Sequence, residues 1–364
     1  MSKFLNNIVG KIINHNDTFY GKIDFNNYIK EIKKTENKNN NNIIIPGFVD
    51  LHCHGGDGFD TMQGIDSIVQ MSKYHLKNGT TSLLPTTLTA TLKDTYKALY
   101  GINNFLEKSA NESNIEGIHL EGPFINPKKL GAQPPFAQIP NIDFVKEIMS
   151  ISKVKIVTLA PELENSNKLI DWLLKENINV QFGHSLADYE CCMKIMTKNK
   201  IGFTHLYNAM SGNDHRNPGV LTAALRHAQY AEIICDLNHV HKESIHLAAK
   251  CIPYIYAISD AIAACGMPNG RYNFSNLKVH KKDNRAFINN NTLAGSVVNM
   301  HDTFRNLIDI NFSLQKAVAM TSYNPSRYIG ETNKGKIDIG YCSNFLVLDK
   351  ELNIKEVYLN GQLI

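Results

Sequence analysis

Eight apolar runs, each ending in polar residues, recur along the middle of this 364-residue chain. They are continuous rather than alternating, which is typical of parallel strands buried on both faces. Segments with helical spacing separate the runs, for example Ile65–Lys77, Asn165–Lys175 and Asp188–Lys198. The runs are Phe48–His54, Thr81–Thr86, Gly117–Glu121, Lys155–Ala160, Val180–His184, Gly202–Asn208, Glu232–His239 and Tyr254–Asp260. This alternation predicts an α/β fold of the (β/α)8 TIM-barrel type. A doubly wound open sheet is the competing fold, but it usually carries a Gly-rich phosphate turn early in the chain, and none is obvious here.

The two ends of the chain have a different texture, with short strand-like segments broken by turn residues. These segments are Ile8–Ile13, Tyr20–Ile23, Lys336–Ile339, Phe345–Leu348 and Val357–Leu359. They predict a small β-sandwich domain formed by residues 1–45 and 334–364 around a catalytic barrel of residues 46–333. The Asn-rich stretch 37–42 is expected to be a solvated loop.

Composition excludes several classes of protein. With 38 Lys and Arg against 34 Asp and Glu, the chain carries a net charge of +4 but no basic stripe, so a nucleic-acid partner is not expected. No apolar run approaches the roughly 20 residues of a membrane span, and the polar first residues do not resemble a signal peptide. The seven cysteines are scattered without a C-x-x-C pair, as expected for reduced thiols in a cytoplasmic protein.

Side chains able to ligate a metal or move a proton stand at the ends of the apolar runs, and those ends share one mouth in a parallel barrel. They are His52, His54, Glu121, His184, His205, His239 and Asp260. Since residues i and i+2 of a strand face the same side, His52 and His54 can reach one cation, while Cys53 points away and is expected to pack. Imidazole and carboxylate ligands suit Zn, Fe, Co or Mn rather than Ca or Mg.

The segment PGFVDLHCHG at residues 46–55 resembles the first-strand signature of the amidohydrolase superfamily, whose members are metal-dependent barrels with a small β-sandwich. Further blocks are similar to the N-acetylglucosamine-6-phosphate deacetylase family. They are HLEGPF at 119–124, GHS at 183–185, THLYNAM at 204–210, SDA at 259–261 and LAGS at 293–296. The resemblance runs in unbroken order from about Ile45 to Asn344.

This resemblance implies hydrolysis of N-acetylglucosamine 6-phosphate to glucosamine 6-phosphate and acetate, in amino-sugar metabolism. It makes Glu121, His184 and His205 the main metal ligands, and the presence of His52 and His54 makes a second site chemically available. One or two divalent metals per subunit are therefore expected, with Zn or Fe the first choices. Asp260 is implied as the general base and acid, and His239 as the donor to the tetrahedral oxyanion.

The resemblance also implies substrate contacts and a homodimer in which Arg216 serves the neighbouring subunit's site. The contact residues are Ala132, Asn208, Ala209, Arg216, Asp236, Leu237, Asn238, His239, Leu293, Ala294 and Gly295. One departure is Gln133, where the family often has His, and it leaves N-acetylgalactosamine 6-phosphate open as the substrate.

Two other readings stay open. Another amide hydrolase of the superfamily would typically use a carboxylated Lys after the fourth strand, but the fourth run here ends at Ala160-Pro161-Glu162. A non-catalytic barrel that binds sugar phosphate or metal is the alternative from a different class.

Overall fold

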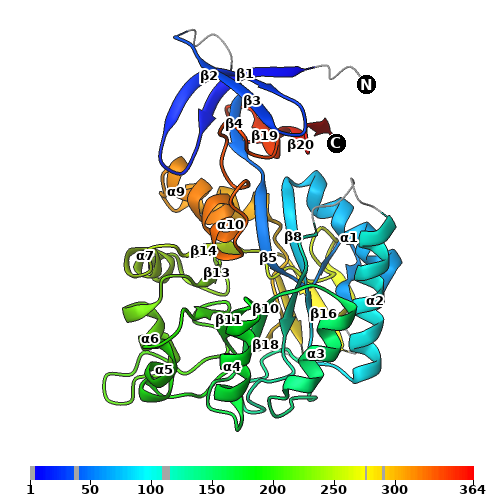
Figure 1. Cartoon of the computed structure of the whole chain (residues 1–364), viewed down its shortest axis with the longest axis vertical. Helices are drawn as coiled ribbons and strands as arrows, with labels where there is room; N and C mark the ends of the chain where they lie inside the picture. The colour runs from blue at the N-terminus through cyan, green and yellow to red at the C-terminus, as the bar shows by residue number, and fades with distance from the viewer. Residues whose placement is uncertain (1–4, 37–40, 109–114, 275–276, 289–291) are drawn as a thin grey trace.

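The computed structural model describes residues 5–36, 41–108, 115–274, 277–288 and 292–364. Eight parallel strands form its centre (Figure 1). They are β5 (Phe48–Cys53), β8 (Thr80–Thr87), β9 (Ile118–Glu121), β10 (Val154–Leu159), β11 (Asn179–Phe182), β12 (Gly202–Phe203), β13 (Glu232–Ile234) and β14 (Tyr256–Ile258). Each predicted apolar run overlaps one of these strands.

The eight strands close into a barrel in two pieces. Six of them form one parallel sheet in the order β12-β11-β10-β9-β8-β5, and β13 pairs with β14. The backbone N–H of Leu206, just after β12, donates to the Glu232 carbonyl at 2.9 Å. On the other side, the N–H of His54 donates to the Ala261 carbonyl at 2.8 Å. The β13–β14 pair therefore bridges both edges of the six-stranded sheet, and the TIM-barrel prediction is confirmed.

Helices follow the strands and cover the barrel from outside. They are α1 (Ile65–Lys77), α2 (Leu92–Lys108), α3 (Ile142–Ile151), α4 (Ser166–Lys175), α5 (Tyr189–Met196), α6 (Val220–His227), α7 (Lys242–Cys251), α8 (Met300–Asp309), α9 (Leu314–Val318) and α10 (Asn324–Tyr328), with a 3-10 turn η1 (Thr61–Gln63) and a π-helical turn η2 (Ala319–Tyr323). Helix α1 buries Ile68, Met71 and His75 at helical spacing. Asp188 caps α5 by accepting the N–H of Cys191.

Strands from both ends of the chain form one seven-stranded sheet in the order β21-β20-β19-β4-β1-β2-β3. They are β1 (Asn6–Ile13), β2 (Thr18–Phe25), β3 (Ile29–Lys34), β4 (Ile43–Pro46), β19 (Phe345–Leu348), β20 (Ile354–Leu359) and β21 (Gln362–Leu363). The sheet curls until Phe25 of β2 meets Phe345 of β19, with 5.0 Å between ring centroids, so its two halves enclose an apolar core. The boundaries at residues 45/46 and 333/334 stay a prediction.

One expected strand of this terminal sheet is wrong. Lys336–Ile339 forms no ladder, because the Asn14 side chain takes the place of a partner strand. Its Nδ2 donates to the Ile337 carbonyl at 3.1 Å, and its Oδ1 accepts the Ile337 N–H at 2.8 Å. Residues 37–40 of the Asn-rich stretch lie outside the described residues, so the expected loop there is not tested.

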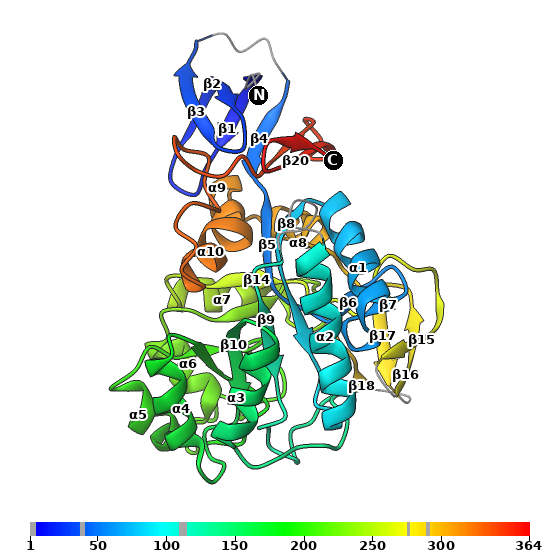
Figure 2. The same cartoon turned by 45° about the vertical axis from the view of Figure 1, so that its right-hand side comes forward.

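A four-stranded antiparallel sheet follows the barrel strands and was not predicted. It comprises β15 (Gly270–Phe274), β16 (Leu277–Lys282), β17 (Arg285–Ile288) and β18 (Thr292–Leu293), and Figure 2 shows β15–β17 in yellow beside α1. A short hairpin of β6 (Gly55–Gly56) and β7 (Phe59–Asp60) follows β5. Among the helices of the described ranges, none has the length and apolar character to cross a membrane.

Candidate active site

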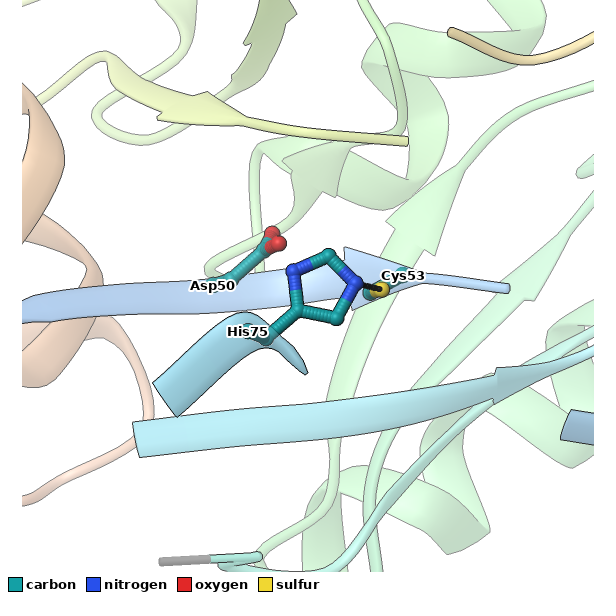
Figure 3. Close-up of side chains that lie close together, drawn as sticks. All are labelled: Asp50, Cys53 and His75. Atoms are coloured by element: carbon teal, nitrogen blue, oxygen red, sulfur yellow. Dashed lines mark hydrogen bonds between the residues drawn. The ribbon is translucent and has the colours of Figure 1, made fainter. Parts of the chain in front are cut away.

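Strand β5 presents different side chains on its two faces. Its pairing with β8 shifts register between Asp50 and Cys53, and such irregularities re-aim side chains at barrel rims. His52 and His54 face the barrel interior, with 3.1 Å between their Nε2 atoms. Cys53 faces outward with Asp50, as Figure 3 shows, where His75 of α1 lies 3.2 Å from the Cys53 sulfur. The expectation that Cys53 packs away from the two histidines is therefore confirmed.

Polar groups of this outward cluster form hydrogen bonds with neighbouring parts of the fold. His75 Nε2 donates to the Gly55 carbonyl at 3.0 Å, and Asp50 accepts the Ser259 hydroxyl at 2.5 Å. Burial lowers the pKa of His75 to about 4, so this imidazole is neutral at pH 7. We assign the cluster to packing between β5, α1 and the end of β14.

On the inner side, Glu121 joins two histidines from neighbouring strands. Its Oε1 atom lies 3.2 Å from His184 Nε2 and 3.1 Å from His205 Nε2, and these two nitrogens are 3.1 Å apart. All three side chains are buried. The ligand set proposed for the main metal is therefore brought together at the carboxyl ends of β9, β11 and β12.

A second group adjoins the first. His52 and His54 lie 3.5 Å and 3.4 Å from Asp260 Oδ1, measured from their Nε2 atoms. The other Glu121 oxygen, Oε2, is 3.3 Å from His54 Nε2. Glu121 therefore faces both groups, with Oε2 against His54 and Oε1, which contacts the first group, also 3.6 Å from His52 Nε2.

The ring orientations fit a divalent metal in both groups. His54 Nδ1 contacts the Thr86 carbonyl at 3.1 Å, and His184 Nδ1 contacts the Lys129 carbonyl at 2.7 Å. Because a carbonyl only accepts, Nδ1 carries a proton in each ring, and Nε2 points inward as the nitrogen available to a metal. In each group, three ligand atoms lie within 4.8 Å of one another. This is the donor chemistry of a divalent-metal site.

Electrostatics also favour a cation here. Burial alone would raise the pKa of Glu121, but the neighbouring His52, His184 and His205 hold its pKa well below the usual range. Burial likewise opposes ionisation of Asp260, yet the charges of His52 and His54 lower its pKa. In the same way, Asp260 and Glu121 outweigh burial and raise the pKa of His54 to about 9. The two buried carboxylates of Glu121 and Asp260 therefore stabilise positive charge beside them, and a bound cation would supply that charge.

Three of these residues sit on strained backbone. His184, His205 and Asp260 have φ values of +50°, +30° and +47°, in the left-handed region that non-glycine residues seldom adopt. Such conformations concentrate where side chains must be aimed at a site. In each case the residue leaves its strand abruptly and turns its side chain over the barrel mouth.

A cavity of about 160 Å³ opens above these groups. Of the expected substrate contacts, Ala132, Asn208, Ala209, His239, Leu293 and Gly295 line it. Asp236 lies behind His239, accepting its Nδ1–H at 2.7 Å, while Ala294 is buried and bonded to Ala286. Leu237 is largely exposed, and Asn238 bonds to Arg285. Arg216 lies on an exposed loop, away from the cavity of its own chain.

A sequence profile of the Amidohydrolase family matches residues 43–364. The chain belongs to the amidohydrolase family. An N-acetylglucosamine-6-phosphate deacetylase of Lysinibacillus sphaericus is 34% identical over 328 residues, covering 88% of this chain and 85% of the relative. An N-acetylgalactosamine-6-phosphate deacetylase of Escherichia coli O157:H7 is 30% identical, covering 88% and 87%.

The fold of this amidohydrolase also matches a solved structure. The N-acetylglucosamine-6-phosphate deacetylase of Thermotoga maritima is 28% identical, with a TM-score of 0.91 over 98% of this chain and 99% of the other. A barrel joined to a terminal β-sheet is therefore shared over the full length.

Sequence reasoning missed several residues at the site of this amidohydrolase. Gln133 stood out only as a departure, yet its Nε2 donates to Glu121 Oε2 and its Oε1 accepts the Thr89 N–H at 2.7 Å. Phe274 of β15 lines the cavity against His54, with 5.8 Å between ring centroids. Glu232 opens its apolar run instead of ending it, so a search of strand ends passes over it. Its charge inside an apolar run was the available signal.

Proposed function

We propose that this amidohydrolase is a deacetylase that hydrolyses N-acetylglucosamine 6-phosphate to glucosamine 6-phosphate and acetate. The observation that carries the proposal is Glu121 shared between two ligand groups, with Asp260 beside them on the same cavity. Named relatives with this activity cover most of the chain. We place the protein in the cytoplasm, where the seven free thiols would stay reduced.

Glu121, His184 and His205 would hold one divalent metal, and His52 and His54 would hold a second beside Asp260. Zn or Fe fits these ligands best. When bound, the metal acts as a Lewis acid that polarises the amide carbonyl and makes water more acidic.

Asp260 is the residue placed for proton transfer. Its carboxylate is held ionised, so it can accept a proton from the attacking water. The water oxygen bonds to the acetyl carbon, the C–N bond breaks, and Asp260 returns the proton to the leaving amine. Asp236 accepts the Nδ1–H of His239 and, against the effect of burial, raises the pKa of this imidazole. The protonated ring can then donate its Nε2–H to the oxyanion in the cavity.

The sugar would lie against Ala132, Asn208, Ala209, Leu293 and Gly295. Among the described residues that line the cavity, none is Lys or Arg, although a phosphate needs cationic donors. We therefore propose a homodimer in which Arg216 of one subunit reaches the phosphate in the other. Its exposed position on the loop at residues 211–219 is compatible with that role.

N-acetylgalactosamine 6-phosphate is the second candidate substrate. Gln133 supports this second substrate, because its side-chain amide already bonds to Glu121 and Thr89 and is not free to select one sugar epimer. A relative named for that substrate is also 30% identical.

The test is acetate release from both phosphorylated N-acetylhexosamines and their unphosphorylated forms, with metal content measured on the same sample. We expect rapid release from N-acetylglucosamine 6-phosphate, loss after chelation and recovery with added Zn²⁺ or Fe²⁺. Metal-loaded protein that releases no acetate from any of these sugars would refute the proposal.

A further inference from the structure

Glu232, the first residue of β13, lies under the second ligand group and has no part in the reaction described so far. Its Oε2 lies 2.9 Å from His52 Nδ1, and both side chains are completely buried. Because both Glu232 oxygens also accept from N–H donors of the fold, this contact places the proton on His52 Nδ1. The Nε2 atom of His52 is then free to face His54 and Asp260.

His52 differs from the other histidines of the two groups in this partner. Nδ1 of His54 and of His184 rests on a neutral backbone carbonyl. Nδ1 of His205 has no hydrogen-bond partner in the described part of the chain. Among these four ligand histidines, as far as the described residues show, only His52 is backed by a carboxylate. A carboxylate makes an imidazole both more fixed and more basic than a carbonyl does.

Glu232 is itself held firmly. Its Oε1 accepts from Gln181 Nε2 at 3.1 Å and from the Tyr256 hydroxyl at 3.4 Å, while Oε2 also accepts the His205 backbone N–H at 3.3 Å. Both carboxylate oxygens therefore accept hydrogen bonds, and Glu232 cannot rotate away from His52 without breaking several of them.

We propose that Glu232 is a positioning residue that makes His52 a ligand and so permits a second divalent cation beside the Glu121–His184–His205 site. The inference rests on the proposed function, because Glu232 would support the second of the two metal sites proposed there. His205 is touched only through its backbone, so the first group depends on Glu232 less than the second group does. Loss of such a supporting carboxylate typically weakens metal binding by roughly 10- to 100-fold.

Metal binding, measured on stripped protein, tests this assignment. Metal-free wild type, Glu232→Gln and Tyr256→Phe are titrated with Zn²⁺ and with Co²⁺, and equivalents and dissociation constants are read for each site. We expect two equivalents in wild type, a roughly 10- to 100-fold weaker second site in Glu232→Gln, and an unchanged first site. Tyr256→Phe removes another donor to the same carboxylate but leaves His52 paired, and should retain both affinities.

Equal weakening of both sites, or no weakening, would overturn the role of Glu232, since a merely structural residue would not select one site. Binding of a single equivalent to wild type would overturn it as well. Thermal unfolding of the metal-free proteins checks that the variants fold. If Glu232→Gln does not fold, Glu232→Asp, which keeps the charge but shortens its reach, is expected to show the same selective loss. Two bound equivalents without acetate release would instead refute only the proposed deacetylase activity.

Discussion

Replacing Asp260 by Asn isolates proton transfer from metal binding. Asn has the same shape and tolerates the left-handed backbone at this position, where φ is +47°. It also keeps an oxygen where Oδ1 now lies, 3.4 Å from His54 Nε2 and 3.5 Å from His52 Nε2. The variant is therefore expected to fold and to bind metal with nearly the same stoichiometry.

The expected loss follows from the two proton transfers assigned to Asp260. One positioned acid or base contributes roughly 10²- to 10⁴-fold. Apart from Asp260, Glu121 is the only carboxylate among the described residues that line the cavity, and it already contacts His184 and His205. Little is therefore available to replace Asp260 in proton transfer. We expect kcat to fall towards the upper limit, by about 10⁴-fold or ~5 kcal/mol.

The assay is acetate release with metal content determined on the same preparation. Asp57→Asn is the matched control, because Asp57 also has a left-handed backbone, with φ of +54°, but is exposed and does not line the cavity. It should retain full activity. An Asp260→Asn enzyme that binds metal normally and keeps a tenth or more of the wild-type kcat would refute the assignment.

Three further changes test other parts of the site. Arg216→Ala should raise KM strongly for the phosphorylated sugar and little for the unphosphorylated one. Equal effects on both sugars would reject a phosphate role for Arg216. A protein that is monomeric in solution would reject the site shared between subunits. Gly295→Ala places a Cβ 2.6 Å from the Asp260 carbonyl oxygen and should lower kcat at least tenfold, whereas Gly212→Ala, which meets nothing within 4 Å, should not change it. Because burial lowers the pKa of His75 from 6.5 to about 4, about 3 kcal/mol of stability present above pH 6.5 is lost as pH falls towards 4. His75→Gln should remove most of that pH dependence in urea unfolding at pH 7 and 4.5, while His215→Gln on an exposed loop should leave it intact.

Much of the fold was accessible from the sequence because parallel strands buried on both faces leave continuous apolar runs. The ends of those runs also located His184, His205 and Asp260 without reference to any relative. Their strained backbones left no such signal, since nothing in the residue types requires a positive φ.

The errors have local physical causes. Lys336–Ile339 has strand-like composition, but the side chain of Asn14 satisfies the backbone of Ile337, and no pattern reveals a side chain in place of a strand. Strands β15 and β16 are short and alternate between exposed and more buried positions, so a search for continuous apolar runs passes over them. Phe274 was therefore missed, although it packs on His54.

The terminal sheet has a consequence for how the protein is made. Strand β4 runs directly into β5, which carries His52, and β4 lies between β1 and β19. The bond between Asn14 and Ile337 spans 323 positions in the chain. During synthesis every barrel strand is made before β19 exists, so the nascent chain carries β4 with one edge unpaired until β19 has been made. Synthesis of β19, rather than emergence of the barrel, should set the moment when the strand bearing His52 is finally anchored.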